Sequence, residues 1–266
     1  MLKRFALGLV LIIIAIGIIF IALNILDIDE DYRLLLPIPV LNTVFIFAIA
    51  ALVAYIAARS YTITGSMVIL LLGGAALAFG AGSLFKSWAS LGLDVTMTVD
   101  ESAALIASIL HLVAATVGTS QQRISNLEFR GKSGIILGYY LGVIACIALV
   151  ILLVIQGVIP SFHVPGEGSS VLRVVVRRIT AILFVAAAVI NLITYYKSRT
   201  DFYYWYSLGL SLFGFGVFFI SQGAVESRVA WLGRTAHYVG GIYFLVAVLG
   251  AYRLASTKKV EVSPSW

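Results

Sequence analysis

Two histidines in apolar segments are the side chains best suited to chemistry in this chain. His111 lies in the segment SILHLVAATV, and His237 lies in GRTAHYVGG. Helical rise places His111 about 15 Å and His237 about 5 Å below the nearer membrane boundary. A haem held by two histidines needs both rings at one height, so this pair does not fit it. We expect His111 to bond to a neighbouring helix; a metal, a haem, a proton relay or a small polar ligand are the alternatives.

Arginines gather where two further helices are expected to begin. Such side chains can reach lipid headgroups or pair with acidic loops. The alternative is that they coordinate an anionic ligand, or the acidic segment 27–31, near the outer face. The residues are Arg173, Arg177 and Arg178 in one segment, and Arg228 and Arg234 around Trp231 in the other.

Motifs of known catalytic sites do not occur in the sequence. There is no HExxH, GxSxG, P-loop, CxxC or glycine-rich dinucleotide fingerprint. No carboxylate falls inside an apolar window, which disfavours a proton-coupled pump. Cys146, the single cysteine, cannot form an intrachain disulfide. We therefore expect no catalytic residues, no enzyme activity and no cofactor, with haem or metal at His111 as the alternative.

The composition places these side chains in a membrane. Of the 266 residues, 61% are hydrophobic and 11% are charged, and the mean hydropathy is +1.07. Soluble domains average about 45–50% apolar and about 25% charged residues. A soluble single domain, a disordered chain and a nucleic-acid partner are excluded, although the formal net charge is +6. The sequence predicts an all-α multi-pass protein in a lipid bilayer.

Apolar windows long enough to cross the membrane number eight, since a spanning helix needs about 20 residues. The number falls to seven if the short window 102–119 is re-entrant. Asp100 and Glu101 are assigned to the outer loop before that window. The windows are 5–25, 38–58, 67–87, 102–119, 134–158, 174–196, 203–222 and 235–254.

The windows form one transmembrane domain, 1–255, followed by a short cytoplasmic tail, 256–266. A polar inner loop divides the domain into two four-helix halves, 1–132 and 133–255. The segments 72–87 and 208–222 are similar, as in a parallel repeat. Glycines are dense in three windows, 67–87, 203–222 and 235–254, which predicts tight helix packing; a ligand cleft beside the glycines is the alternative.

Basic residues indicate the orientation. With the N-terminus inside, the inner segments carry eleven of the eighteen Lys and Arg residues, and the outer loops carry nine of the twelve Asp and Glu residues. Positive residues favour the cytoplasmic side. We expect a cell-membrane protein with both termini in the cytoplasm.

Two stretches resemble a known kind of membrane region. The segment 91–115 contains Thr96-Met97-Thr98-Val99-Asp100 and ends its helix with His111-Leu112. The segments 204–222 and 231–249 include a Gly-Arg-x-x-His-Tyr-x-Gly-Gly-x-Tyr pattern. They are similar to the membrane-associated sensor (MASE-type) regions of archaeal and bacterial PAS-domain histidine kinases. There Asn is usual at the position of Asp100 and Gln at that of His237.

The resemblance implies a helical input module that senses a small ligand or a membrane state and signals through its last helix. Only 13 residues follow Arg253, and they contain no kinase. We therefore expect one of three cases: a stand-alone sensor, a sensor that a separate cytoplasmic signalling protein reads, or a fragment of a longer protein. A homodimer is the other assembly that we expect. The alternative functions are a small-solute transporter and a haem- or metal-binding membrane protein. The candidate ligand-binding residues are Trp88, Asp94, His111, Trp231, Arg234, His237 and Tyr238. The candidate anion or headgroup contacts are Arg173, Arg177 and Arg178.

Overall fold

The computed structural model describes residues 37–121, 132–164, 168–222 and 227–262. Within these ranges, seven helices are long and apolar enough to cross a membrane. The prediction of an all-α multi-pass membrane protein is therefore confirmed. The predicted window 5–25 and the acidic segment 27–31 lie outside the described residues.

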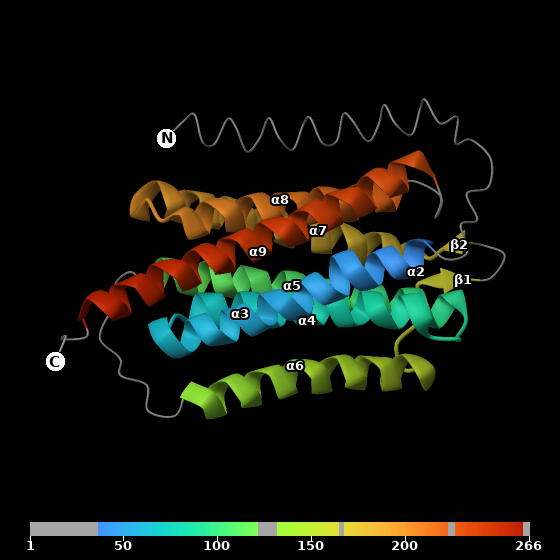
Figure 1. The fold of residues 1–266 in the computed structure, drawn as a ribbon. Coiled ribbons are helices and arrows are strands. Elements are labelled where there is room, and N and C mark those ends of the chain that lie inside the picture. Colours follow the sequence, from blue (N-terminus) through green and yellow to red (C-terminus); the bar gives the residue numbers. More distant parts are fainter. Residues whose placement is uncertain (1–36, 122–131, 165–167, 223–226, 263–266) are drawn as a thin grey trace.

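The helices run side by side along one axis, with a short β-hairpin at one end (Figure 1). The hairpin pairs His163 with Ser169 and Val164 with Gly168. The elements in chain order are α2 (Pro37–Leu41), the π-helical segment η1 (Asn42–Ala48), α3 (Ile49–Thr64), α4 (Met67–Trp88), α5 (Leu93–Gln121), α6 (Lys132–Ile155), β1 (His163–Val164), β2 (Gly168–Ser169), α7 (Val171–Ser198), α8 (Asp201–Gln222) and α9 (Arg228–Val262).

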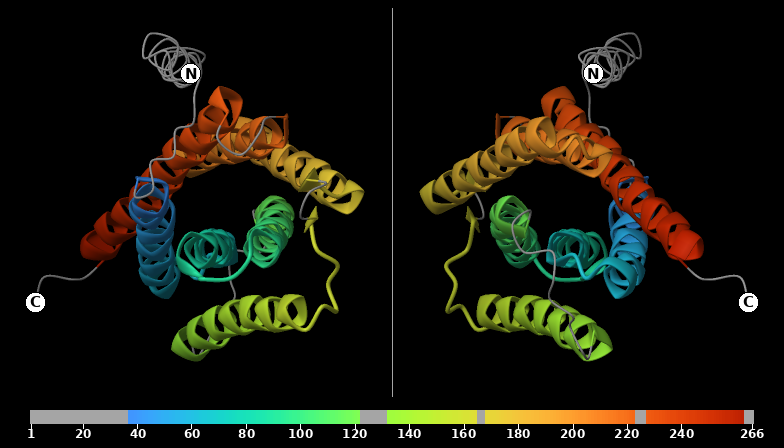
Figure 2. Two further views of the ribbon diagram at one scale, coloured as in Figure 1. Left: turned by 90° about the vertical axis from the view of Figure 1, so that its right-hand side faces the viewer. Right: turned by 90° about the vertical axis from the view of Figure 1, so that its left-hand side faces the viewer.

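Six of these helices close a ring, and α6 lies outside it. Neighbours in the ring are α3 and α4, α4 and α5, α5 and α7, α7 and α8, α8 and α9, and finally α9 and α3. The end-on views in Figure 2 show α6 below α4 and α5, against which it mainly packs. Two tyrosines attach α6 to the ring: Tyr139 donates a hydrogen bond to the carbonyl of Leu71 and Tyr140 to that of Ala54.

Helix α5 is longer than the sequence indicated. The residues just before the window 102–119, of which Asp100 and Glu101 are assigned above to an outer loop, are helical, and α5 begins at Leu93. The whole of Leu93–Thr119 qualifies as a spanning segment, so the window 102–119 belongs to a full span. This places Asp100 and Glu101 two turns inside the helix. Because the span Leu93–Thr119 contains these two carboxylates, the expectation that no carboxylate lies within a span is wrong. The argument against proton-coupled transport that depended on this expectation no longer holds.

Glycines allow close approach between helix backbones. A Cβ on Gly233 of α9 would lie 2.6 Å from the carbonyl oxygen of Gly216 in α8. A Cβ on Gly80 of α4 would lie 2.7 Å from the Cβ of Ala50 in α3. These distances are shorter than van der Waals contact, so a larger residue would force the helices apart. The predicted tight packing along glycine-rich α4, α8 and α9 is confirmed.

Candidate functional site

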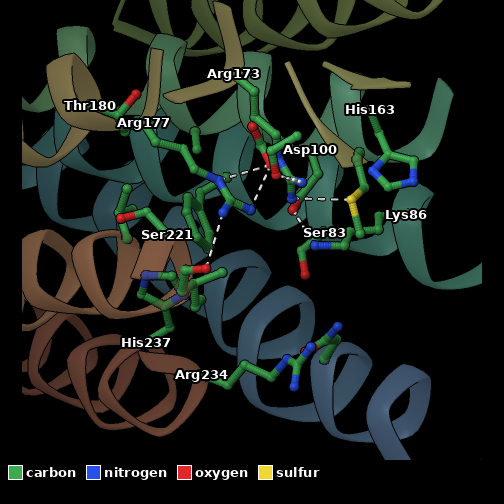
Figure 3. A pocket seen from close by; sticks show the side chains of 18 of the residues that line it. Ser83, Lys86, Asp100, His163, Arg173, Arg177, Thr180, Ser221, Arg234 and His237 are labelled. Carbon is green, nitrogen blue, oxygen red and sulfur yellow. Dashed lines mark hydrogen bonds and ion pairs between the residues drawn. The ribbon is translucent and has the colours of Figure 1, made fainter. Parts of the chain in front are cut away.

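A cavity of about 310 Å³ opens near the hairpin end of the bundle. Its size lies at the lower end of the range for small-molecule sites, about 300–1,000 Å³. The walls come from η1, α4, α5, the hairpin, α7, α8 and α9, and Figure 3 shows the side chains that converge on it. The charged residues that line the cavity are Lys86, Asp100, Glu101, Arg173, Arg177 and Arg234.

Glu101 lies at the centre of a buried ion network. Its Oε1 accepts a hydrogen bond from Nε of Arg173 at 2.7 Å and lies 2.7 Å from Nη2 of Arg177. The side chains of Glu101 and Arg173 are only 7% and 5% exposed, so both charges are removed from solvent. A buried charge is tolerated when it is paired and hydrogen-bonded. The other carboxylate oxygen, Oε2, has no hydrogen-bond partner among the described residues.

The two arginines are held in place by further acceptors. Arg173 donates from Nη1 to Oγ of Ser169 at 2.7 Å. Arg177 donates from Nη1 to the carbonyl oxygen of Ile220 at 3.0 Å. Arg173 and Arg177 are four residues apart and therefore lie on the same face of α7. That face points into the ring, where α5 supplies Glu101.

A second ion pair joins α4 to α5. Nζ of Lys86 lies 2.7 Å from Oδ2 of Asp100. The side chains are 28% and 19% exposed, so this pair is more accessible than the pairs of Glu101. It stands at the mouth of the cavity, where a ligand could compete for Lys86.

The β-hairpin covers part of the cavity. The backbone N–H of Phe162 donates to Oγ1 of Thr98 at 3.0 Å, and the Phe162 side chain is buried. His163 lines the cavity, and its Nδ1 is buried without a hydrogen-bond partner among the described residues. Because Ser169 also binds Arg173, the hairpin and the ion network stabilise one another.

Helix α9 forms the opposite wall. The guanidinium of Arg234 lies 5.1 Å from the centre of the Trp231 ring, a cation–π distance. His237 is buried one turn deeper, where Nε2 donates to the carbonyl oxygen of Phe213 at 3.3 Å. Tyr238 donates to Oδ1 of Asn42 at 2.9 Å, which connects α9 to the π-helical segment η1.

The structure brings only part of the predicted site together. Arg234, His237, Arg173 and Arg177 line the cavity. Trp231 and Tyr238 do not line it, but each contacts a residue that does. Arg173 and Arg177 pair with an acidic residue, but this residue, Glu101, lies in helix α5 and not in an acidic loop as expected.

Trp88, Asp94, His111 and Arg178 lie elsewhere. Trp88 is exposed and donates from Nε1 to Oγ1 of Thr43 at 2.7 Å. Asp94 is in the first turn of α5 and does not line the cavity. Arg178 is exposed on the outer face of α7, where it can reach headgroups.

His111 is sealed inside the ring. Its Nδ1 is 2.8 Å from the hydroxyl of Tyr206, and the rings of Phe184 and Phe244 pack against it. The expectation of a buried histidine bonded to a neighbouring helix is confirmed. His111 does not line the cavity. Nε2 has no hydrogen-bond partner among the described residues.

Sequence reasoning missed Lys86, Asp100 and Glu101. The signal was present, because Asp94, Asp100 and Glu101 recur at six to seven residues, close to two helical turns. That spacing is compatible with one polar stripe on a helix that begins earlier than the apolar window does. Lys86, close to the end of its window, carried no separate signal.

Neither a metal cluster nor a relative identifies the site. The described ranges contain no group of three or more His, Cys, Asp or Glu side chains that could hold a metal ion. Comparison with known protein families, with curated proteins and with solved structures gives no match. The function must therefore be argued from the cavity itself.

Proposed function

We propose that this chain is a membrane-embedded receptor module that binds a small ligand in the cavity and transmits occupancy through α9. The observation that carries the proposal is that α9 lines the cavity near its N-terminal end and continues to the opposite end of the bundle (Figure 1). A ligand that contacts Arg234 or His237 therefore acts directly on the helix that leaves the bundle.

Helix α9 is in contact with η1 and α8 beside the cavity, so a ligand bound there can change how α9 packs against them. Near the cavity, α9 is connected to η1 by the hydrogen bond from Tyr238 to Asn42 and packs closely on α8 at Gly216. The π-helical form of η1 also supports a functional role, because such segments are frequent at functional sites. A ligand that prefers one position of α9 would shift the population toward that position.

The distribution of charge supports a cytoplasmic output. Eleven of the eighteen Lys and Arg residues are assigned to the inner segments, among them Arg59, Lys197 and Arg253, which lie near the end of the bundle away from the cavity. The basic residues at the cavity end, Lys86, Arg173, Arg177 and Arg234, are exceptions to this bias. Positive residues favour the cytoplasmic side. We therefore place the cavity at the outer face of the cell membrane and the C-terminal end of α9 in the cytoplasm. There a separate signalling protein, or a second copy of this chain, would read the movement.

The resemblance of 91–115, 204–222 and 231–249 to membrane-associated sensor regions supports the same function. The resemblance implies that the signal leaves the sensor region through its last helix. Among the described elements the last helix is α9, and the similar segments contribute Asp100, Glu101, Ile220, Arg234 and His237 to the cavity.

Spin labels at the inner end of the bundle test the proposal. With Cys146→Ser as background, Arg59→Cys and Thr257→Cys report the distance between α3 and α9. Arg59→Cys with Tyr196→Cys is the matched control, because α7 replaces α9. Each pair is measured with isovalerate, isobutylammonium and isobutanol, and calorimetry identifies the probes that bind. We expect a bound probe to change the α3–α9 distance and to leave the control distance nearly constant.

The same samples separate the receptor from a transporter. The carboxylates in α5 remove one objection to transport, so flux must be measured directly. A probe that binds without changing the α3–α9 distance, and that crosses the membrane of proteoliposomes faster than that of protein-free liposomes, would contradict the receptor function and support the transporter. A change in distance without flux would support the receptor.

A further inference from the structure

Among the residues that the structure describes, the charged side chains that line the cavity do not balance. Leaving Arg234 aside, the described lining contains three positive side chains, Lys86, Arg173 and Arg177, and two negative ones, Asp100 and Glu101. One positive charge is therefore in excess even before Arg234 is counted. In a poorly solvated site, an excess charge favours a ligand of opposite sign.

The free oxygen of Glu101 adds a second requirement. Oε1 is bound by both arginines, whereas Oε2 is buried without a hydrogen-bond partner among the described residues. A buried acceptor that is left unpaired costs about 1–3 kcal/mol. A ligand that donates a hydrogen bond to Oε2 would recover that cost.

Three apolar side chains of the lining lie deeper than the charged ones, beside the polar side chains of Thr180 and His237. Phe79 precedes Lys86 by seven residues on α4, which places it about 10 Å farther into the bundle. Ala104 on α5 and Val217 on α8 likewise lie one turn inward from Glu101 and Ile220. The ligand therefore has a charged end at the mouth and a short apolar end toward the core.

We infer that the cavity binds an organic monoanion, a carboxylate or phosphate, that carries a hydroxyl or other hydrogen-bond donor and a short apolar group. The anionic end contacts Lys86 and Arg177, and the donor binds Oε2 of Glu101. This inference rests on the proposed function only in using the same cavity. Both a free hydroxy acid and a glycerol phosphate headgroup of a lipid have this chemistry.

Four soluble probes of similar size test each part of the ligand. Isothermal titration is performed on the full chain in phosphatidylcholine nanodiscs with α-hydroxyisovalerate, isovalerate, isobutanol and isobutylammonium. We expect α-hydroxyisovalerate to bind best. Loss of the hydroxyl should weaken binding about tenfold, and loss of the charge by at least as much, because hydrogen bonds to charged groups are strong. Tighter binding of isobutylammonium, or equal binding of all four probes, would overturn the inference.

Nanodiscs that contain phosphatidylglycerol identify the source of the ligand. If that lipid competes with α-hydroxyisovalerate, or is retained on the protein while the soluble acids do not bind, the natural anion is a headgroup. If α-hydroxyisovalerate binds equally well with and without phosphatidylglycerol, the natural anion is a soluble molecule. If neither the soluble acids nor phosphatidylglycerol binds, the inference is overturned.

Charge variants test the contacts. Lys86→Gln, at the accessible mouth, should fold normally and weaken α-hydroxyisovalerate binding about tenfold. Arg177→Gln should have a similar effect, and Arg178→Gln, an exposed neighbour on the same helix, is the matched control and should have none. If Arg177→Gln and Arg178→Gln weaken α-hydroxyisovalerate binding equally, the effect is one of general charge and the proposed binding site is wrong.

Acidic residues outside the described ranges provide one further check. Glu167 and Glu226 are close in sequence to residues of the cavity wall, and the charge balance includes neither them nor the acidic segment 27–31. If α-hydroxyisovalerate binds only after Glu167, Glu226 or the acidic residues of 27–31 are replaced by their amides, the chain supplies its own counter-charge and the inference is overturned.

The two inferences fail in different ways. If the anion binds but the α3–α9 distance does not change, the receptor function fails and the ligand chemistry stands. If isobutylammonium binds and changes that distance while the anions do not, the ligand chemistry fails and the receptor function stands.

Discussion

Glu101 and His111 lie on the same helix, ten residues and about 15 Å apart. Glu101 is surrounded by arginines beside a cavity, and its charge is compensated by ion pairs. His111 is surrounded by aromatic rings and makes one hydrogen bond to Tyr206. Both side chains are buried, but only the first lies where a ligand can reach it.

The comparison shows that burial of a polar group in a membrane helix does not by itself indicate a site. Near the middle of the bundle, a neutral group with one partner stabilises packing between helices. Near the end, several charged groups can share partners because the hairpin and polar helix ends supply additional donors and acceptors. A cavity between such groups is what makes this end of the bundle the candidate site.

The largest effect is expected when Glu101 is changed. Glu101→Gln leaves Arg173 and Arg177 buried without a negative partner, which should destabilise the protein by about 3–5 kcal/mol. Thermal unfolding in detergent would measure the loss. Asp94→Asn is the control, because Asp94 is on the same helix and forms no ion pair among the described residues. Similar unfolding temperatures for the two variants would contradict the importance of the ion network.

A smaller effect is expected at His111. His111→Leu leaves the hydroxyl of Tyr206 buried without this partner, at a cost of about 1–3 kcal/mol. The double variant His111→Leu/Tyr206→Phe should be more stable than His111→Leu, because both polar partners are removed together. Unfolding curves of the unchanged protein, His111→Leu, Tyr206→Phe and the double variant complete the double-mutant cycle.

The same variants separate stability from binding. His111 does not line the cavity, so His111→Leu should bind α-hydroxyisovalerate as the unchanged protein does. A loss of binding in a folded His111→Leu variant would show that the aromatic core and the cavity are coupled, and would break the distinction between the two regions.

The smallest effect on stability is expected at Lys86. The Lys86–Asp100 pair is partly exposed, and ion pairs of this kind contribute about 0–1 kcal/mol. Lys86→Met should therefore lower stability by less than about 1 kcal/mol, as measured by thermal unfolding. A loss as large as that of Glu101→Gln would mean that the mouth of the cavity is as buried as its centre.

The sequence alone predicted the membrane-spanning character and seven of the windows that the structure describes as helices. It could do so because runs of apolar residues and the thickness of the bilayer determine which segments span. It also indicated His111 as a buried hydrogen-bonding group, and Arg173 and Arg177 as side chains that need a negative partner. These conclusions depend on local composition and on the cost of placing a polar group in lipid.

The beginning of α5 could not be predicted from hydropathy. The residues 93–101 are polar enough to resemble a loop, but their backbone groups are satisfied in a helix, and Thr98 and Glu101 are buried against the hairpin and α7. The tertiary contacts decided the helix boundary, and with it the depth of Asp100 and Glu101.

The cavity itself was decided by tertiary structure. Residues from η1, α4, α5, the hairpin, α7, α8 and α9 form it, and these segments are separated by up to about two hundred positions in the chain. Sequence spacing places side chains on one face of one helix, but it does not determine which faces meet. That depends on how six helices close a ring, which is why Arg234 and His237 lie at the cavity while Trp88, Asp94 and His111 do not.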